Sequence, residues 1–202
     1  MPDSHDTDTT QRKRRNALAA LKAARGKYIF GSKVRLRRKK LTDVRNDYTW
    51  QSDPELARLD AAPVLKLSFA VYLLDYIEAI HRRERNRFPL AIETLKGEHI
   101  GNCTCYAIDD RKSEAQVGIM IGDRDYWDKG YGADTINTLV DHIFSSTLLN
   151  RVYLKTLDWN LRAQKCFRNC GFVRYSAANR NGYNFLFMEL SRERWQKKHK
   201  KT

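Results

Sequence analysis

The sequence predicts an α+β fold, in which a mixed, mostly antiparallel sheet carries helices on both faces. Three segments in series, 89–95, 99–108 and 114–121, are rich in β-forming residues and are separated by polar turns, which predicts an antiparallel meander. A turn with two glycines follows, and then an amphipathic segment over 131–144 that predicts a helix. A meander followed by helices that pack on it is typical of the α+β class.

The stretch 125–144 is the part around which the chain is organised, and alternating apolar residues over 117–121 predict a strand before it. Gly130 and Gly132 precede a helical pattern carried by Ile136, Leu139, Val140, Ile143 and Phe144. A helix start has unpaired N–H groups and a partial positive charge, and glycines let the backbone approach a ligand closely. This order predicts a cradle for phosphate or pyrophosphate, with a simple tight turn as the alternative.

Two motifs resemble those of a known enzyme family. The first is GIMIG over 118–122 followed by YWDKGYG over 126–132, and the second is N-x-x-A-(seven residues)-G-F, formed by Asn160, Ala163, Gly171 and Phe172. Together they resemble the GNAT superfamily of acetyl-CoA-dependent N-acetyltransferases. The branch that includes the ribosomal-protein N-terminal and polyamine acetyltransferases is the most similar. The resemblance covers roughly residues 33 to 190.

The resemblance implies that acetyl-CoA is the co-substrate and that no metal takes part. In this family the pantetheine arm pairs like an extra strand with the strand before the glycine turn, at the place where that strand diverges from the strand expected over 151–157. A backbone N–H there would polarise the thioester carbonyl. The cofactor-binding residues that the resemblance implies are Ile119, Met120, Ile121, Trp127, Lys129, Gly130, Tyr131, Gly132, Ala133, Asn160 and Phe167.

The catalytic groups are less clear, because the sequence departs from the family at two positions. Phe167 stands where relatives often have a tyrosine that could protonate the leaving thiolate, and Gln116 stands where many have a glutamate. Glu114 is expected on the same strand face as Gln116 and could act as the base, and Glu98 is a further candidate. Exposed surface charge is the alternative interpretation of both glutamates. Asn160 completes the catalytic candidates.

The remaining elements are expected from local patterns. A short helix is expected over 16–25, a first strand over 33–41, helices ending at Trp50 and covering 69–80, a strand over 151–157, a helix over 160–170, and a hairpin of 172–176 with 183–190. In domain terms, residues 1–30 form a basic N-terminal extension that is partly helical or disordered. Residues 31–192 form the acetyltransferase domain, and residues 193–202 form a basic C-terminal tail.

The net charge of +14 is concentrated at the two ends of the chain. Residues 11–40 hold 13 Lys and Arg and no acid, and residues 192–202 hold six Lys and Arg and one acid. The body between them is nearly neutral, with 19 basic and 20 acidic residues over 41–191. Basic ends indicate a contact with a polyanion such as RNA or the ribosome surface, with a solubilising tail as the alternative.

These observations favour an N-acetyltransferase that moves an acetyl group from acetyl-CoA to a primary amine in a ternary complex. The amine would be a protein N-terminus, a polyamine or another small amine. The alternative is a non-catalytic acyl-CoA-binding domain whose basic arms dock on RNA or the ribosome. No apolar run approaches the ~20 residues that span a membrane, and no secretory signal is evident, so a cytoplasmic monomer or homodimer is expected. The four cysteines are expected to be reduced.

Overall fold

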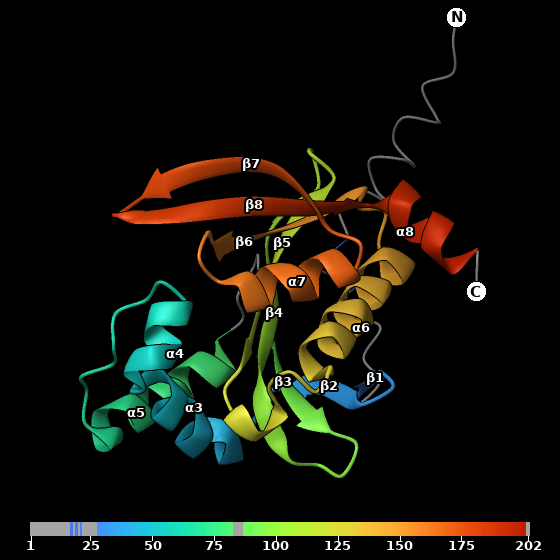
Figure 1. Ribbon diagram of the computed structural model, residues 1–202. Helices are drawn as coiled ribbons and strands as arrows, with labels where there is room; N and C mark the ends of the chain where they lie inside the picture. The colour runs from blue at the N-terminus through green and yellow to red at the C-terminus, as the bar shows by residue number, and fades with distance from the viewer. Residues whose placement is uncertain (1–16, 18, 20, 22–27, 83–86, 201–202) are drawn as a thin grey trace, which may run out of the picture.

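The computed structural model describes residues 17, 19, 21, 28–82 and 87–200 and confirms the predicted α+β class (Figure 1). Its sheet has eight strands in the order β1-β2-β3-β4-β5-β6-β8-β7. The neighbouring strands are antiparallel except for β5 and β6, which are parallel. The strands are β1 Ile29–Phe30, β2 Val34–Arg38, β3 Arg87–Thr94, β4 His99–Asp109, β5 Glu114–Ile121, β6 Arg151–Leu157, β7 Val173–Arg180 and β8 Tyr183–Ser191.

Helices cover both faces of this sheet. In Figure 1, α3, α4 and α5 lie together at the lower left, α6 lies at the right, and α7 crosses in front of the sheet. The helices are η1 Leu41–Asp43, α3 Val44–Gln51, α4 Pro54–Leu59, α5 Phe69–His81, η2 Arg124–Tyr126, α6 Tyr131–Ser146, α7 Leu161–Asn169 and α8 Arg192–His199.

The main core lies between α6 and the sheet. The apolar positions of α6 that the sequence predicts are buried here: Ile136, Leu139, Val140, Ile143 and Phe144. They pack with the inward residues of β2 to β5, among them Leu36, Ile92, Cys103 and Val117. Burying this face holds the start of α6 in place against the sheet, and the glycine turn with it.

The first strand is shorter than predicted, because it ends at Arg38 and not at residue 41. The side chain of Asp43 accepts a hydrogen bond from the backbone N–H of Lys40 at 2.8 Å. The same carboxylate receives two hydrogen bonds from the Arg37 guanidinium, each 2.7 Å long. These contacts turn the chain into η1 and then α3, so the charged residues end the strand.

The C-terminal stretch expected as a basic tail is a helix, α8, as far as His199. The Arg192 side chain donates hydrogen bonds to the carbonyl oxygens of Phe144, Thr147 and Leu149 at 2.7, 2.6 and 2.8 Å. The Trp195 ring lies 5.4 Å from the Phe144 ring. The helix is therefore packed on the end of α6 and the loop that follows it.

Part of the expected N-terminal extension also belongs to the core. Ala17 is 5% exposed and Leu21 is 1% exposed, and both pack in the main cluster. The rest of the helix expected over 16–25, apart from residue 19, lies outside the described residues, as do the first ten residues. Within the described part of the chain, we find no helix with the length and apolarity needed to span a bilayer.

Candidate functional site

Strands β5 and β6 part in the middle of the sheet. They pair only where Glu114 to Gln116 meet Arg151 to Tyr153. Beyond this point β5 continues along β4, and β6 continues along β8. The side of β5 that faces β6 therefore has no ladder partner from Val117 to Ile121, and an extended ligand could pair with its peptide groups.

The glycine turn ends beside this free edge. Gly130 is the N-cap of α6 and has a φ of 84°, a left-handed conformation that glycine adopts without strain. No side chain of the described residues caps the start of α6, so its first N–H groups remain available. A Cβ on Gly132 would lie 3.6 Å from the Cys166 Sγ and 3.9 Å from the Ile121 Cγ1, so this glycine lies close to both β5 and α7. An anion bound here would contact the unpaired backbone N–H groups at the N-terminus of α6.

The glycine turn is anchored by residues 32–34, at the start of β2. The Asp134 carboxylate accepts hydrogen bonds from the backbone N–H groups of Ser32, Lys33 and Val34 at 3.1, 2.7 and 3.0 Å. The Lys33 Nζ donates to the carbonyl oxygen of Lys129 at 2.9 Å. These four hydrogen bonds, all donated by residues 32–34, fix the glycine turn and the first turn of α6 to the start of β2.

The end of β5 and the start of α7 close the other sides of this region. The Trp127 Nε1 donates a hydrogen bond to the Ile121 carbonyl at 2.7 Å. The guanidinium carbon of Arg162 lies 3.5 Å from the centre of the Trp127 ring. Asn160 caps α7, since its side chain accepts a hydrogen bond from the Ala163 N–H at 3.1 Å. Phe167 is only 6% exposed and packs in the main core.

Glu98 lies at this end of the sheet. Its carboxylate accepts a hydrogen bond from the Tyr126 hydroxyl at 2.7 Å. This bond lowers the pKa of Glu98 and raises the pKa of Tyr126 to about 12. The Tyr126 ring in turn meets the Tyr131 ring edge-on, with centroids 4.9 Å apart. Glu98 therefore supports the start of α6 through two tyrosines.

Glu114 lies at the opposite end of β5. Its carboxylate accepts a hydrogen bond from the Arg151 Nη1 at 3.0 Å. Ile121, at the other end of the strand, pairs with Gly101 just after Glu98. Seven residues of strand separate Glu114 from Ile121, which is about 23 Å. The structure therefore does not bring the two predicted glutamates into one site.

The structure reveals a third carboxylate, Asp60, that the sequence pattern did not single out. Asp60 follows α4 and is open to solvent, yet desolvation by the surrounding protein raises its pKa, and the Lys155 charge opposes this rise. Desolvation, helped by the Asp60 charge, raises the pKa of Tyr106 to about 12. The Tyr106 ring lies 3.5 Å from where a Cβ of Gly118 would stand. Asp60 is thus placed near the point where β5 and β6 part.

Long-range packing puts Asp60 there. Ala61 packs against a small apolar cluster of Leu157, Phe185 and Phe187 on the face of β6 and β8 opposite to α7. Ala61 has a φ of 51°, a conformation that is unusual for alanine. This packing is not visible in the local sequence, because Leu157, Phe185 and Phe187 lie at least 96 positions further along the chain.

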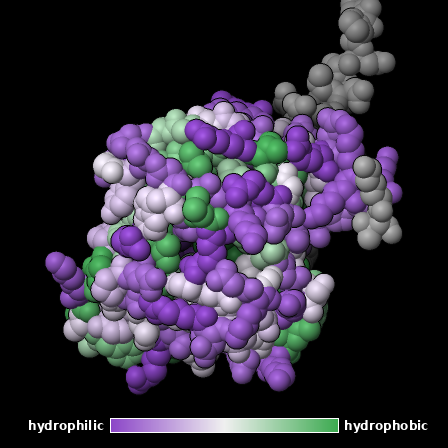
Figure 2. Space-filling model, in the orientation of Figure 1, coloured by the Kyte–Doolittle hydropathy of each residue, from purple (hydrophilic) through white to green (hydrophobic). Residues whose placement is uncertain are grey.

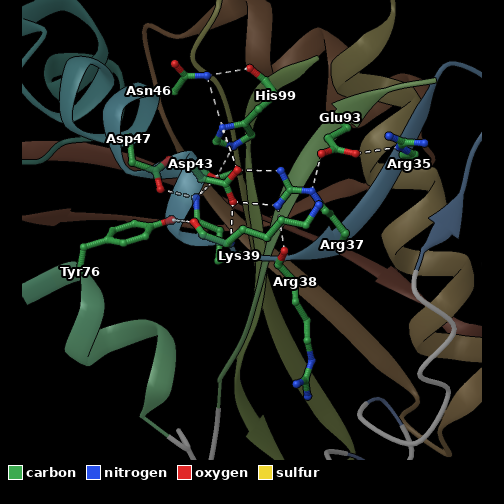
Figure 3. A network of polar contacts seen from close by, with 12 residues as sticks. Arg35, Arg37, Arg38, Lys39, Asp43, Asn46, Asp47, Tyr76, Glu93 and His99 are labelled. Atoms are coloured by element: carbon green, nitrogen blue, oxygen red, sulfur yellow. Dashed lines mark hydrogen bonds and ion pairs between the residues drawn. The ribbon is translucent and has the colours of Figure 1, made fainter. Parts of the chain in front are cut away.

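A buried network of charges holds α3 on the same face (Figure 3). The Arg37 and Asp43 side chains, 4% and 2% exposed, form a two-pronged ion pair. Glu93 pairs with Arg37 and also accepts a hydrogen bond from the Arg35 Nε at 2.7 Å. Lys39 and Asp47 form a further ion pair beside them. Burying these charges requires that each be paired, so the network fixes the position of α3 relative to β2 and β3.

His99 completes this network as a ring whose pKa lies below its ordinary value. Desolvation lowers its pKa, and this effect outweighs the nearby Asp43 carboxylate, whose oxygen lies 3.7 Å from the His99 Nδ1. The ring also packs 4.9 Å from the Trp50 ring. The Trp50 ring in turn fills the space beside Gly122, where a Cβ would come within 2.1 Å of it. The network therefore continues to the loop that follows β5.

Comparisons with known proteins agree with this geometry. The chain is 27% identical to an uncharacterized N-acetyltransferase p20 from Bacillus licheniformis over 146 residues, which are 71% of this chain and 81% of that protein. The fold is similar to that of spermidine N-acetyltransferase from Vibrio cholerae in complex with CoA and spermine. The TM-score is 0.71, the identity is 20%, and the match covers 82% of this chain and 99% of that one.

A similar fold is found in an aminoglycoside acetyltransferase in complex with coenzyme A, with a TM-score of 0.68 and 19% identity over 82% of this chain and 99% of that one. The family model described as "Acetyltransferase (GNAT) domain" matches residues 33–173. This match covers more than half of the chain and includes β2, the glycine turn and α7. The chain therefore belongs to the GNAT family of acetyltransferases.

Proposed function

We propose that this protein transfers the acetyl group of acetyl-CoA to a primary amine by direct attack in a ternary complex. One observation carries the proposal: the uncapped start of α6 behind Gly130 lies beside the unpaired edge of β5. A pyrophosphate at the helix start and a pantetheine arm along Val117 to Ile121 would occupy these two features together. We propose a polyamine, another small amine or a protein N-terminus as the acceptor, and the similarity to spermidine and aminoglycoside acetyltransferases supports the small amines.

The donor side would be held by the residues that the sequence predicted. The backbone of Lys129 to Ala133 would bind the pyrophosphate, and Ile119 to Ile121 would pair with the pantetheine arm. Trp127 would hold the end of β5 through its bond to Ile121. Asn160, whose side-chain oxygen caps α7, would offer its amide Nδ2 to the ligand. Phe167 would act from the core by supporting α7.

We infer that Asp60 is the base that takes a proton from the attacking ammonium group. An amine must be neutral to attack the thioester, and a base with a raised pKa is better matched to that task than an ordinary carboxylate. Glu98 and Glu114 are each engaged, by Tyr126 and Arg151 respectively. The Asp60 carboxylate also provides the negative charge that would attract a cationic acceptor.

The test compares three variants, each with one carboxylate replaced by an amide. Asp60→Asn should lower kcat by roughly 10²–10⁴-fold, while the Kd of acetyl-CoA stays within twofold of wild type. Glu98→Gln and Glu114→Gln should retain most of the activity. In Asp60→Asn, the pH profile of kcat/KM should also lose its acidic limb. Wild-type turnover in Asp60→Asn would remove Asp60 from the mechanism.

A second candidate function rests on Phe167, which has no proton to give a leaving thiolate and is buried in the core. In this alternative the protein binds an acyl-CoA without turning it over. Acetyl-CoA binding in the absence of thiol release, over a panel of polyamines, aminoglycosides and peptide N-termini, would favour it.

We further propose that the active site lies within residues 31–192. We also propose that the protein works in the cytoplasm as a monomer or homodimer, and that its basic ends contact a polyanion.

A further inference from the structure

A second hollow lies on the far side of α7 from the glycine turn. Its volume is about 460 Å³, and it is bordered by α7, β7, β8 and α8. Arg168, on its wall, is eight residues beyond Asn160, which places it about 12 Å further along the helix axis. Gln164 and Arg168 line the hollow from one side of α7, whereas Cys166, which faces Gly132, lies on the opposite side of the helix, so the hollow is separate from the glycine turn. Its volume falls in the range of small-molecule sites.

Three arginines from three different elements line this hollow: Arg168 of α7, Arg174 of β7 and Arg194 of α8. All three are exposed, and none forms a direct ion pair with an acidic side chain among residues 28–82 and 87–200, although the Glu193 carboxylate lies near enough to Arg194 to feel its charge. Like charges around one hollow repel each other unless an anion lies between them. Guanidinium groups match phosphate and carboxylate geometry, so the wall fits a ligand with more than one negative charge.

The floor of the hollow is apolar. It is lined by Phe172, Val173, Leu186 and Met188. The half-buried Val173 and Leu186 provide its accessible area, because Phe172 and Met188 are each only 2% exposed. An inorganic anion would leave this floor in contact with water. A ligand with a flat or apolar body would cover it, which gains free energy from the area removed from water.

The walls are fixed by the fold. Gln164 is buried and its Nε2 donates to the carbonyl oxygens of Leu157 and Asp158 at 3.2 and 2.8 Å, which holds α7 against the end of β6. The Arg192 side chain fixes α8 through its three carbonyl contacts. In β7 the pairing register shifts between Arg174 and Ser176, and such bulges re-aim side chains and are common beside functional sites. The three arginines are therefore presented from a preformed frame.

We propose that this hollow is a binding site for a nucleoside phosphate. Its phosphates contact Arg168, Arg174 and Arg194, and its base lies on the apolar floor. The ligand is either a free nucleotide or a terminal nucleotide of an RNA strand, since both present the same chemistry. The surface of α8, at the upper right of Figure 2, is hydrophilic, and its lysines extend the positive charge away from the hollow.

The experiment is a calorimetric titration with ATP in the presence of saturating acetyl-CoA, so that the proposed donor site is filled. We expect wild type to bind ATP, and Arg168→Gln/Arg174→Gln to bind it at least tenfold more weakly. The matched control is Lys165→Gln/Arg180→Gln, which removes two positive charges from the same two elements but outside the hollow. The control should bind ATP within twofold of wild type.

Inorganic phosphate should bind at least tenfold more weakly than ATP, because it does not cover the floor. An RNA pentanucleotide that binds more tightly than ATP identifies a strand end as the source, and weaker binding identifies a free nucleotide. No ATP binding by folded wild type, or an equal loss in the control, would overturn the proposal. The same titration without acetyl-CoA keeps the test valid if the chain proves to have no acetyltransferase activity.

Discussion

The Lys33 Nζ donates a hydrogen bond to the Lys129 carbonyl at 2.9 Å, and so joins the segment before β2 to the glycine turn nearly 100 residues away. Lys33→Met keeps the length of the side chain but removes this donor. We expect the turn to loosen and the Kd of acetyl-CoA to rise about fivefold to tenfold, or about 1–1.4 kcal/mol, which is the usual net contribution of one hydrogen bond. Calorimetry measures this change, and kcat at saturation should remain near wild type. Lys96→Met, on an exposed turn, is the control.

Gly132 is close enough to β5 and α7 that a large side chain would fill the proposed pyrophosphate cradle. Gly132→Trp should abolish acetyl-CoA binding in calorimetry. Gly132→Ala should fold normally, because its Cβ would meet the nearest atom at an ordinary contact distance of 3.6 Å. Undiminished binding by the tryptophan variant would show that the turn is only a connection between strand and helix.

The buried ion pair of Arg37 with Asp43 predicts a large effect on stability. Asp43→Asn leaves the Arg37 charge buried without its main partner, and we expect a loss of about 3–5 kcal/mol in the free energy of unfolding. Chemical denaturation measures this loss. Glu193→Gln, which breaks the exposed pair with Lys197, should leave the unfolding midpoint unchanged. A small loss in Asp43→Asn would mean that Glu93 alone can hold Arg37.

The lowered pKa of His99 predicts a dependence of stability on pH. Desolvation lowers its folded pKa below the ordinary value of 6.5, so the unfolded chain binds a proton first as the pH falls. Stability should therefore decline below about pH 6.5, and the decline should continue until the folded pKa is reached, at about 1.4 kcal/mol for each unit between the two values. Denaturation at pH 7.5 and 5.5 measures it.

A variant separates His99 from other groups that titrate in this range. His99→Gln should flatten the decline between pH 7.5 and 5.5. His142, which desolvation also makes harder to protonate, should account for part of the slope that remains. His81→Gln, on the exposed end of α5, is the control. An unchanged slope in His99→Gln would mean that His99 does not cause the decline.

The packing of α8 on α6 predicts that Trp195 contributes to stability. Its Nε1 donates a hydrogen bond to Asp141 and its ring contacts Phe144. Trp195→Ala should lower the free energy of unfolding by about 2–4 kcal/mol, somewhat less than a fully buried tryptophan. Gln196→Ala, on the exposed side of the same helix, should have little effect. Equal unfolding midpoints for Trp195→Ala and Gln196→Ala would show that the packing of α8 does not stabilise the domain.

Local signals in the sequence were sufficient for the central elements. The α6 pattern, the glycine turn and the hairpin at Asn181 and Gly182 each depend on residues close together in the chain, and the structure has each of them. The sequence did not predict helix α8, because Trp195 is its only large apolar residue and the segment therefore has no periodic apolar face. Strand β7 runs to Arg180, beyond the predicted residue 176, since its outer half is exposed and polar.

The candidate site was only partly predictable, because its halves differ in how they are built. The donor side follows from one local motif and its family resemblance. The proposed acceptor side depends on the segment after α4, where Ala61 packs on β6 and β8, and nothing near Asp60 in the sequence indicates that contact. Phe167 is predicted to lie beside the cofactor, and the structure shows in addition that it is buried in the core with Cys170. Such placements are decided by which elements pack together, which a single sequence does not reveal.

The last strand made, β8, lies between β6 and β7 in the sheet. A nascent chain that has just left the ribosome as far as β7 would therefore expose the edge of β6 and have no place to add β7. Exposed strand edges are sites of aggregation. The sheet becomes complete only after β8 has been translated, and chains cut short before β8 should accumulate as insoluble material.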